Sequence, residues 1–346
     1  MPVTSATSSD TAVNTSDTPS SLWPGLLLSA GIAAVAFGLG QWLPLVGGPV
    51  FGIVLGVVVR NLVAPPTACQ PGIRFAGKQI LQWSIVALGL GLSLTQVART
   101  GMDSLAVTLV SVAAAFLAAL LLGRLLGIPS KLKLLIGAGT AICGGSAIAA
   151  VTPIIKADEH DTAFAISTIF LFNLVAVLVF PALGHLMGMS PEGFGLWAGT
   201  AINDTSSVVA AGYAYGKEAG DHATIVKLTR ATLIIPLCLM LAAIEAWRHK
   251  KHGGGDFSLW RVVPWFILWF VVASAVSTAG LIPDAWQPAI RLGAKLLIIV
   301  ALTAIGLSAD LRRMAATGFR PIALGLGVWA AVALSSLAVQ YATGQV

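Results

Sequence analysis

Apolar stretches of about 20 residues recur along the chain from residue 22 to residue 340, separated by short polar connections. An α-helix needs a run of this length to cross the hydrocarbon core of a bilayer. The pattern therefore predicts an all-α polytopic membrane protein with about 11 transmembrane helices. These helices are expected at residues 22–42, 47–63, 74–95, 103–126, 132–155, 162–186, 193–213, 224–246, 259–280, 288–309 and 319–340.

Composition supports this class. Of the 346 residues, 57% are hydrophobic and only 10% are charged, whereas a soluble domain averages about 25% charged residues. Residues 1–21 are rich in Ser and Thr and contain no Lys or Arg, so we expect a disordered polar tail rather than a signal peptide. Residues 22–346 then form a single transmembrane domain, and the net charge of +6 lies on its connections.

The stretch at residues 132–155 has an unusual centre, with Cys143, Gly144, Gly145 and Ser146 at its middle. Adjacent glycines weaken a helix and favour a break. In a membrane, broken backbone is tolerated only where it is buried in protein or lines a water-filled cavity. The alternative is close packing of intact helices through small residues.

A second copy of this pattern favours the break. Residues 133–147 resemble residues 295–309, with one single-residue gap. Interrupted apolar segments at matching positions in two halves are typical of a transporter's central site. We therefore predict inverted five-helix repeats at residues 47–187 and 191–341, an extra first helix at 22–46, and discontinuous helices at 132–155 and 288–309 that cross near the midplane. Chance similarity between alanine-rich helices is the alternative.

The ends of broken helices carry partial charges. Helix amino termini attract anions, and Ser146 and Ser308 are candidate N-caps there. Either hydroxyl could instead bond back to its own helix. The carboxyl termini attract cations, or need a neutralising Lys or Arg.

The stretch at 193–213 is the most polar and contains Asn203, Asp204, Thr205 and Ser206. A carboxylate near mid-membrane costs about 2.5–3.5 kcal/mol, so it should face the interior of the bundle. Asp204 is our candidate coupling group, for a proton or a sodium ion. Its structural alternative is an ion pair that only stabilises packing.

Lys227 and Arg230 lie three residues apart and share one helix face. If they face inward, they could hold an anion; if the span begins later, they are interface residues that reach the lipid headgroups. Asn173 is more simply an interhelical hydrogen-bonding residue.

Lys and Arg in the connections predict the orientation. Thirteen lie on one side, which should be the cytoplasm, and five on the other. The amino terminus is then cytoplasmic and the carboxyl terminus lies outside. The five outer residues are Arg99, Lys156, Lys217, Arg291 and Lys295.

No enzyme signature is present in the sequence. The five His residues and the three Cys residues show no metal-ligand spacing, and there is no phosphate-binding loop. We expect no cofactor, no metal, no catalytic residue and no nucleic-acid partner. A homodimer is left open.

Three motifs carry a resemblance to a known family. Residues 140–150 (TAICGGSAIAA), 201–211 (AINDTSSVVAA) and 227–230 (KLTR) resemble the YeiH-type sulfate exporter family. The resemblance covers the chain after about residue 22. It implies a fold related to the sodium/proton antiporters and bile-acid symporters, in which two discontinuous helices cross.

These observations favour a secondary transporter that moves a small anion, sulfate or sulfonate-like, across the cytoplasmic membrane by alternating access. The alternative is a sodium- or proton-coupled transporter of a neutral or organic solute, such as a nucleoside or bile-acid-like compound. Asp204 is the predicted coupling residue. The predicted substrate-binding residues are Cys143, Gly144, Gly145, Ser146, Asn203, Thr205, Ser206, Lys227, Arg230 and Ser308.

Overall fold

The structure is a computed structural model that describes residues 21–43, 47–248, 265–315 and 318–346. Within these residues the chain is helical and has no β-strand, which confirms the predicted all-α class. The predicted tail at 1–21 lies outside the described residues except for Ser21. The helices are α1 (Trp23–Trp42), α2 (Gly47–Leu62), η1 (Thr67–Cys69), α3 (Gln70–Phe75), the π-helical turn η2 (Ala76–Ile80), α4 (Leu81–Gly89), α5 (Leu94–Asp103), α6 (Leu105–Leu125), α7 (Ser130–Ala141), α8 (Gly145–Ile155), α9 (Glu159–Leu186), α10 (Pro191–Ala201), α11 (Thr205–Tyr215), α12 (Lys217–Thr232), α13 (Ile234–Arg248), α15 (Trp265–Thr278), η3 (Asp284–Trp286), α16 (Gln287–Ser308), α17 (Leu311–Ala315) and α18 (Phe319–Thr343).

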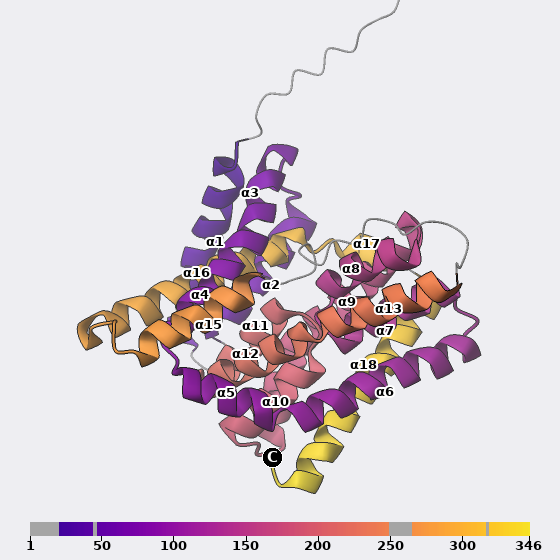
Figure 1. Cartoon of the computed structure of the whole chain (residues 1–346). Coiled ribbons are helices and arrows are strands. Elements are labelled where there is room, and N and C mark those ends of the chain that lie inside the picture. The colour runs from indigo at the N-terminus through magenta and orange to yellow at the C-terminus, as the bar shows by residue number, and fades with distance from the viewer. Residues whose placement is uncertain (1–20, 44–46, 249–264, 316–317) are drawn as a thin grey trace, which may run out of the picture.

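The helices form two groups (Figure 1). In the smaller bundle, α1, α2, α3, α4, α15 and α16 pack mainly on one another. The larger bundle consists of α6 to α12, with α18 packed against α6, α7, α9 and α10. Helices α2 and α16 meet α9 and α11 through a shared buried apolar cluster, so this surface joins the two bundles.

Six described helices are long and apolar enough to cross a membrane, or seven if one bent pair counts as a single span. Five of the eleven predicted stretches fall on helices that are short, bent or broken, so the count of eleven remains a prediction. One such stretch is residues 74–95. There Thr67–Gly89 meets α5 at an angle of 108°, and Ser93 caps α5 by accepting a hydrogen bond from the Gln96 amide at 3.1 Å.

The predicted break within residues 288–309 is wrong, because α16 runs without interruption from Gln287 to Ser308. Its glycine has a packing role instead. A Cβ atom on Gly306 would lie 2.3 Å from the carbonyl oxygen of Ile53, and one on Gly56 would lie 2.4 Å from that of Thr303. The two glycines let α2 and α16 approach closely, which is the packing that small residues provide in membrane bundles.

The second discontinuous helix occurs instead at residues 191–215, where the hydrophobic pattern predicts one continuous span at 193–213. There α10 ends at Ala201 and α11 begins at Thr205. The predicted break at residues 142–144 is confirmed, between α7 and α8. In the described residues, one of the two predicted breaks is therefore present, and a second break lies at residues 202–204 rather than within 288–309.

Candidate functional site at the crossing of two broken helices

The first break depends on one glycine. The helix α7 ends at Ala141, and Gly144 precedes α8 with φ +68° and ψ −126°, a conformation that L-residues other than glycine rarely adopt. A Cβ atom on Gly144 would also lie 3.3 Å from Cγ2 of Ile169 and 3.5 Å from Cβ of Asp204. The first break therefore lies directly against the second.

The second break is capped by a carboxylate. Asp204 is the N-cap of α11, and its Oδ2 accepts a hydrogen bond from the Ser206 amide at 3.0 Å. The Ser206 hydroxyl donates to the same oxygen. The Asp204 amide donates to Oδ1 of Asn173 on α9 at 3.3 Å, so Asn173 makes the interhelical hydrogen bond that was expected of it. These bonds fix the carboxylate at the amino terminus of a half-helix, where its charge is favoured.

Two buried cations join the carboxyl termini of the half-helices. Lys227 on α12 donates from Nζ to the carbonyl oxygens of Ile142 and Ile202, each at 2.9 Å. Both Lys227 and Arg230 are 0% exposed. Because Ile142 follows α7 and Ile202 follows α10, one ammonium group ties together the ends of both half-helices.

Arg230 extends the same connection. Its Nε donates to the carbonyl oxygen of Ala141 at 2.6 Å and its Nη2 to that of Thr140 at 2.6 Å. Its Nη1 donates to the carbonyl oxygen of Thr200 on α10. Each helix end carries about half a negative charge, so a guanidinium and an ammonium offset it well. The residues face inward, because α12 begins at Lys217, seven residues before the predicted start of the span.

Several polar atoms near the breaks lack partners among the described residues. Both side-chain polar atoms of Asn203 are buried without a hydrogen bond, as are Oγ1 of Thr140 and Nδ2 of Asn173. An unsatisfied buried polar group costs about 1–3 kcal/mol. These atoms are therefore available to bind a polar ligand, an ion or water.

A family model described as conserved hypothetical protein 698 matches residues 24–325, and similar proteins named UPF0324 membrane proteins align over nearly the whole chain. The chain belongs to the UPF0324 membrane protein family. This is the same family as the YeiH-type proteins, so the resemblance seen in the motifs is confirmed.

Three relatives show the extent of the similarity. A UPF0324 membrane protein of Fusobacterium nucleatum is 40% identical over 340 residues, covering 92% of this chain and 98% of the relative. One from Streptococcus pyogenes serotype M3 is 43% identical over 330 residues, covering 93% and 97%. One from Clostridium tetani is 38% identical over 336 residues, covering 93% and 97%. These names describe membrane proteins and give no substrate.

Most of the predicted site residues of this UPF0324 protein lie at the two breaks. Cys143, Gly144 and Gly145 lie in or beside the first break, and Asn203, Thr205 and Ser206 in or beside the second. Cys143 and Thr205 are buried. The sequence thus identified both segments, although it did not predict that they meet.

Both candidate N-caps, Ser146 and Ser308, are wrong. Ser146 is an exposed residue in the first turn of α8, and Gly144 occupies the N-cap position. Ser308 is the last residue of α16, and its hydroxyl donates back to the carbonyl oxygen of Ala304 at 3.0 Å. Ser308 therefore follows the alternative prediction, in which the hydroxyl forms a hydrogen bond to its own helix.

A repeat at another offset could have identified the second break. The pentapeptide Ala-Gly-Thr-Ala-Ile occurs at residues 138–142 and again at 198–202. In each copy the Ile carbonyl oxygen accepts from Lys227, and the Thr carbonyl oxygen accepts from Arg230. The two copies therefore end the two half-helices in the same way.

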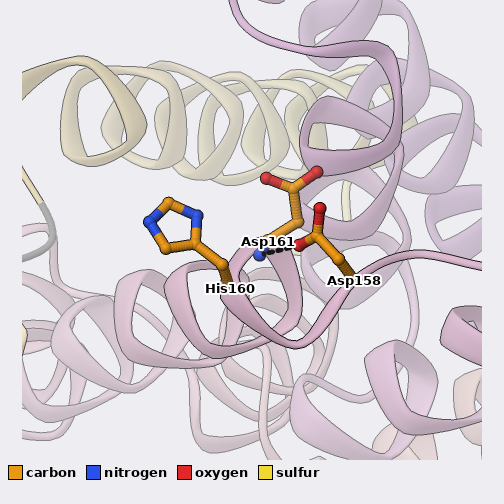
Figure 2. Close-up of side chains that lie close together, drawn as sticks. All are labelled: Asp158, His160 and Asp161. Atoms are coloured by element: carbon orange, nitrogen blue, oxygen red, sulfur yellow. Dashed lines mark hydrogen bonds between the residues drawn. The ribbon is translucent and has the colours of Figure 1, made fainter.

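Asp158, His160 and Asp161 lie together at the start of α9 (Figure 2), and each could offer one metal-ligand atom within 4.8 Å of the others. Helix capping and packing already account for two of them. Asp158 accepts a hydrogen bond from the Asp161 amide at 2.7 Å, and the His160 ring lies 4.1 Å from that of Phe164. We assign no metal site there.

Proposed function

We propose that this protein is a secondary transporter that moves a small anion, sulfate or sulfonate-like, across the cytoplasmic membrane by alternating access. The observation that carries the proposal is the pair of fully buried cations, Lys227 and Arg230, where two broken helices end. Ionisable groups inside a membrane are costly and usually mark a transport pathway. Discontinuous helices of this kind form the central sites of secondary transporters.

The charge at the crossing suits an anion. Two half-helix amino termini and two carboxyl termini meet there, so their partial charges offset one another. Lys227, Arg230 and an ionised Asp204 then leave one formal positive charge. A bound sulfonate would neutralise this charge in a region where water is scarce, and sulfate, a dianion, would do so when Asp204 is protonated.

Asp204 is the proposed coupling residue. Protonation of its carboxyl group would raise the formal charge of the crossing by one, so the affinity for an anion would depend on the proton. Asp204 is partly buried, whereas the residues on either side of it are buried, and coupling requires that protons reach this carboxyl group. This arrangement predicts that proton and anion bind together.

The alternative remains a sodium- or proton-coupled transporter of a neutral or organic solute. Asn203 favours it, because its buried side-chain oxygen has no partner among the described residues and lies next to Asp204. Carbonyl and carboxylate oxygens are suitable ligands for a hard cation. In this case Asp204 and Asn203 would bind the cation and the anion would not be the cargo.

Flux measurements with proteoliposomes test the proposal. Vesicles that contain the purified protein should accumulate labelled sulfate, or a small sulfonate such as ethanesulfonate, when a proton gradient is imposed. Gradient-driven movement of neither anion, with sodium-driven uptake of a nucleoside or bile acid, would support the alternative. Movement of none of these solutes would refute transport as proposed.

Asp204→Asn tests the coupling role with a matched control. Asn caps a helix about as well as Asp, so the variant should fold. It should still exchange the anion passively but lose accumulation and pH dependence. Asp158→Asn makes the same change at the N-cap of α9, away from the crossing, and should accumulate anion like the original protein.

A further inference from the structure

A cavity of about 400 Å³ lies at the boundary between the two bundles, and the proposed site at the crossing does not include it. Its lining residues come from α2, α4 and the turn that follows it, α11, α12 and α16, together with Gly40 of α1. Cavities of roughly 300–1,000 Å³ hold small organic ligands, and they occur preferentially where two structural units meet.

The charged side chains of the cavity are mostly cationic. Lys217, Arg291 and Lys295 line it, with Asp221 as the one carboxylate among its lining residues. Asp221 is already neutralised, since Lys217 donates to its Oδ2 at 2.7 Å and the Tyr213 hydroxyl donates to its Oδ1. Two cations therefore remain for a ligand.

Arg291 and Lys295 project from one face of α16, four residues apart. Neither forms an ion pair or hydrogen bond with another residue in the described part of the chain. Lys295 lies over the Phe37 ring at 5.9 Å, which leaves its ammonium N–H groups free to donate. Gly47 and Gly48, at the positive amino terminus of α2, border the same space.

The rest of the wall is largely apolar. Ala87 and Leu88 of α4, Leu92 in the turn after it, and Ala294 and Ile298 of α16 line the cavity. A bare inorganic anion would leave this surface uncovered, whereas an organic anion would cover it and gain about fourfold in affinity for each buried methylene.

We infer that this cavity binds a small organic anion, with its charged group held by Arg291 and Lys295 and its apolar part against α4. We further infer that the cavity is a substrate-entry site, and this role rests on the proposed transport function. The inference narrows the proposed cargo, sulfate or a sulfonate-like anion, to an anion with a carbon chain. All three cations fall on the predicted outer side of the membrane. The cavity would therefore receive the anion from that side, or release it there.

An anionic lipid has the same chemistry, an acidic group on an apolar body, so the test must separate the two sources. The probes are ethanesulfonate, butanesulfonate, sulfate and the neutral butanesulfonamide, added to purified protein in detergent. A separate arm uses nanodiscs with and without anionic phospholipid. Binding is read from calorimetry and from the shift in unfolding temperature.

Butanesulfonate should bind about fifteenfold more tightly than ethanesulfonate, because it has two more methylenes, and clearly more tightly than sulfate or the sulfonamide. Arg291→Gln and Lys295→Gln should each weaken it about tenfold or more, since each removes a charge-assisted hydrogen bond. Both residues are exposed, so these variants should fold. The matched control is Arg320→Gln, an exposed cation outside the cavity, which should bind butanesulfonate normally.

Equal binding of sulfate or of the sulfonamide would overturn the inference, as would unchanged affinity in both cavity variants. Stabilisation by anionic lipid alone would also overturn it. Binding that depends on Arg291 and Lys295 but without flux in vesicles would refute the proposed function and leave this site intact. Flux in vesicles together with unaltered binding in both variants would support the proposed function and refute this site.

Discussion

The two adjacent glycines at the first break should respond in opposite ways to the same substitution. Gly144 has φ +68° and ψ −126°, which costs an L-residue about 1–3 kcal/mol. Gly145 is the first residue of α8, does not have a positive φ, and a Cβ atom there would meet nothing closer than Cε2 of Phe170 at 3.9 Å. Alanine at Gly145 should therefore stabilise the protein by about 0.5–1 kcal/mol, because it restricts the unfolded chain without straining the folded one.

These energies translate into measurable shifts. At about 2 °C per kcal/mol, Gly144→Ala should lower the unfolding temperature by roughly 2–6 °C, and Gly145→Ala should raise it by roughly 1–2 °C. Unfolding would be followed in detergent at a constant scan rate, because the transition is expected to be irreversible. Gly144→Ala should also slow flux, since its methyl group would lie 3.3 Å from Cγ2 of Ile169, closer than ordinary packing, and so shift the break that lies beside Asp204.

Either of two results would refute this reasoning. If Gly144→Ala unfolds and transports like the original protein, the backbone at residue 144 is not in the left-handed region. If both variants lose stability equally, the break has been placed at the wrong glycine.

Three further predictions follow from the crossing and the fold. Arg230→Gln should lose about 3–5 kcal/mol of stability in thermal unfolding. Adding Asp204→Asn should not restore this stability, because Arg230 binds carbonyl oxygens, and recovery in the double variant would indicate an ion pair instead. Ser308→Ala should leave flux unchanged, since its hydroxyl bonds only to its own helix, and a large loss would return Ser308 to the site. A cysteine at Thr343 should react with an impermeant thiol reagent outside intact cells and one at Phe319, the other end of α18, should not; the reverse pattern would invert the predicted orientation.

The part of the site that local chemistry determines was predictable from sequence. Adjacent glycines in an apolar span indicated the first break, and the spacing of Lys227 and Arg230 placed both on one helix face. Their partners were not predictable, because the carbonyl oxygens of Ile142 and Ile202 belong to segments distant in sequence. Backbone carbonyls also carry no residue-specific signal.

The misplaced second break has a physical explanation. A glycine inside a membrane helix can mark a break or a close approach to another helix, and only the position of the neighbour decides between them. At Gly306 the neighbour is α2, packed too closely for a side chain. Residues 202–204 contain no glycine. The helix α10 ends at Ala201, and Asp204 caps the start of α11, because Asn and Asp favour helix caps and turns over helix interiors.

Alternating access, the central claim, requires the two bundles to move against each other, and a reversible cross-link between them tests it most directly. A Cβ atom on Gly47 of α2 would lie 3.7 Å from Cα of Ala214 on α11, close enough for a disulfide between cysteines at these positions. Because Gly47 has φ +75°, the reduced Gly47→Cys variant must first be shown to fold and to transport. Oxidation of the double variant in proteoliposomes should stop gradient-driven anion flux, and reduction should restore it, while each single variant is unaffected by oxidant. If the fully cross-linked protein transports as fast as its reduced form, the bundles do not move as proposed and the account is wrong.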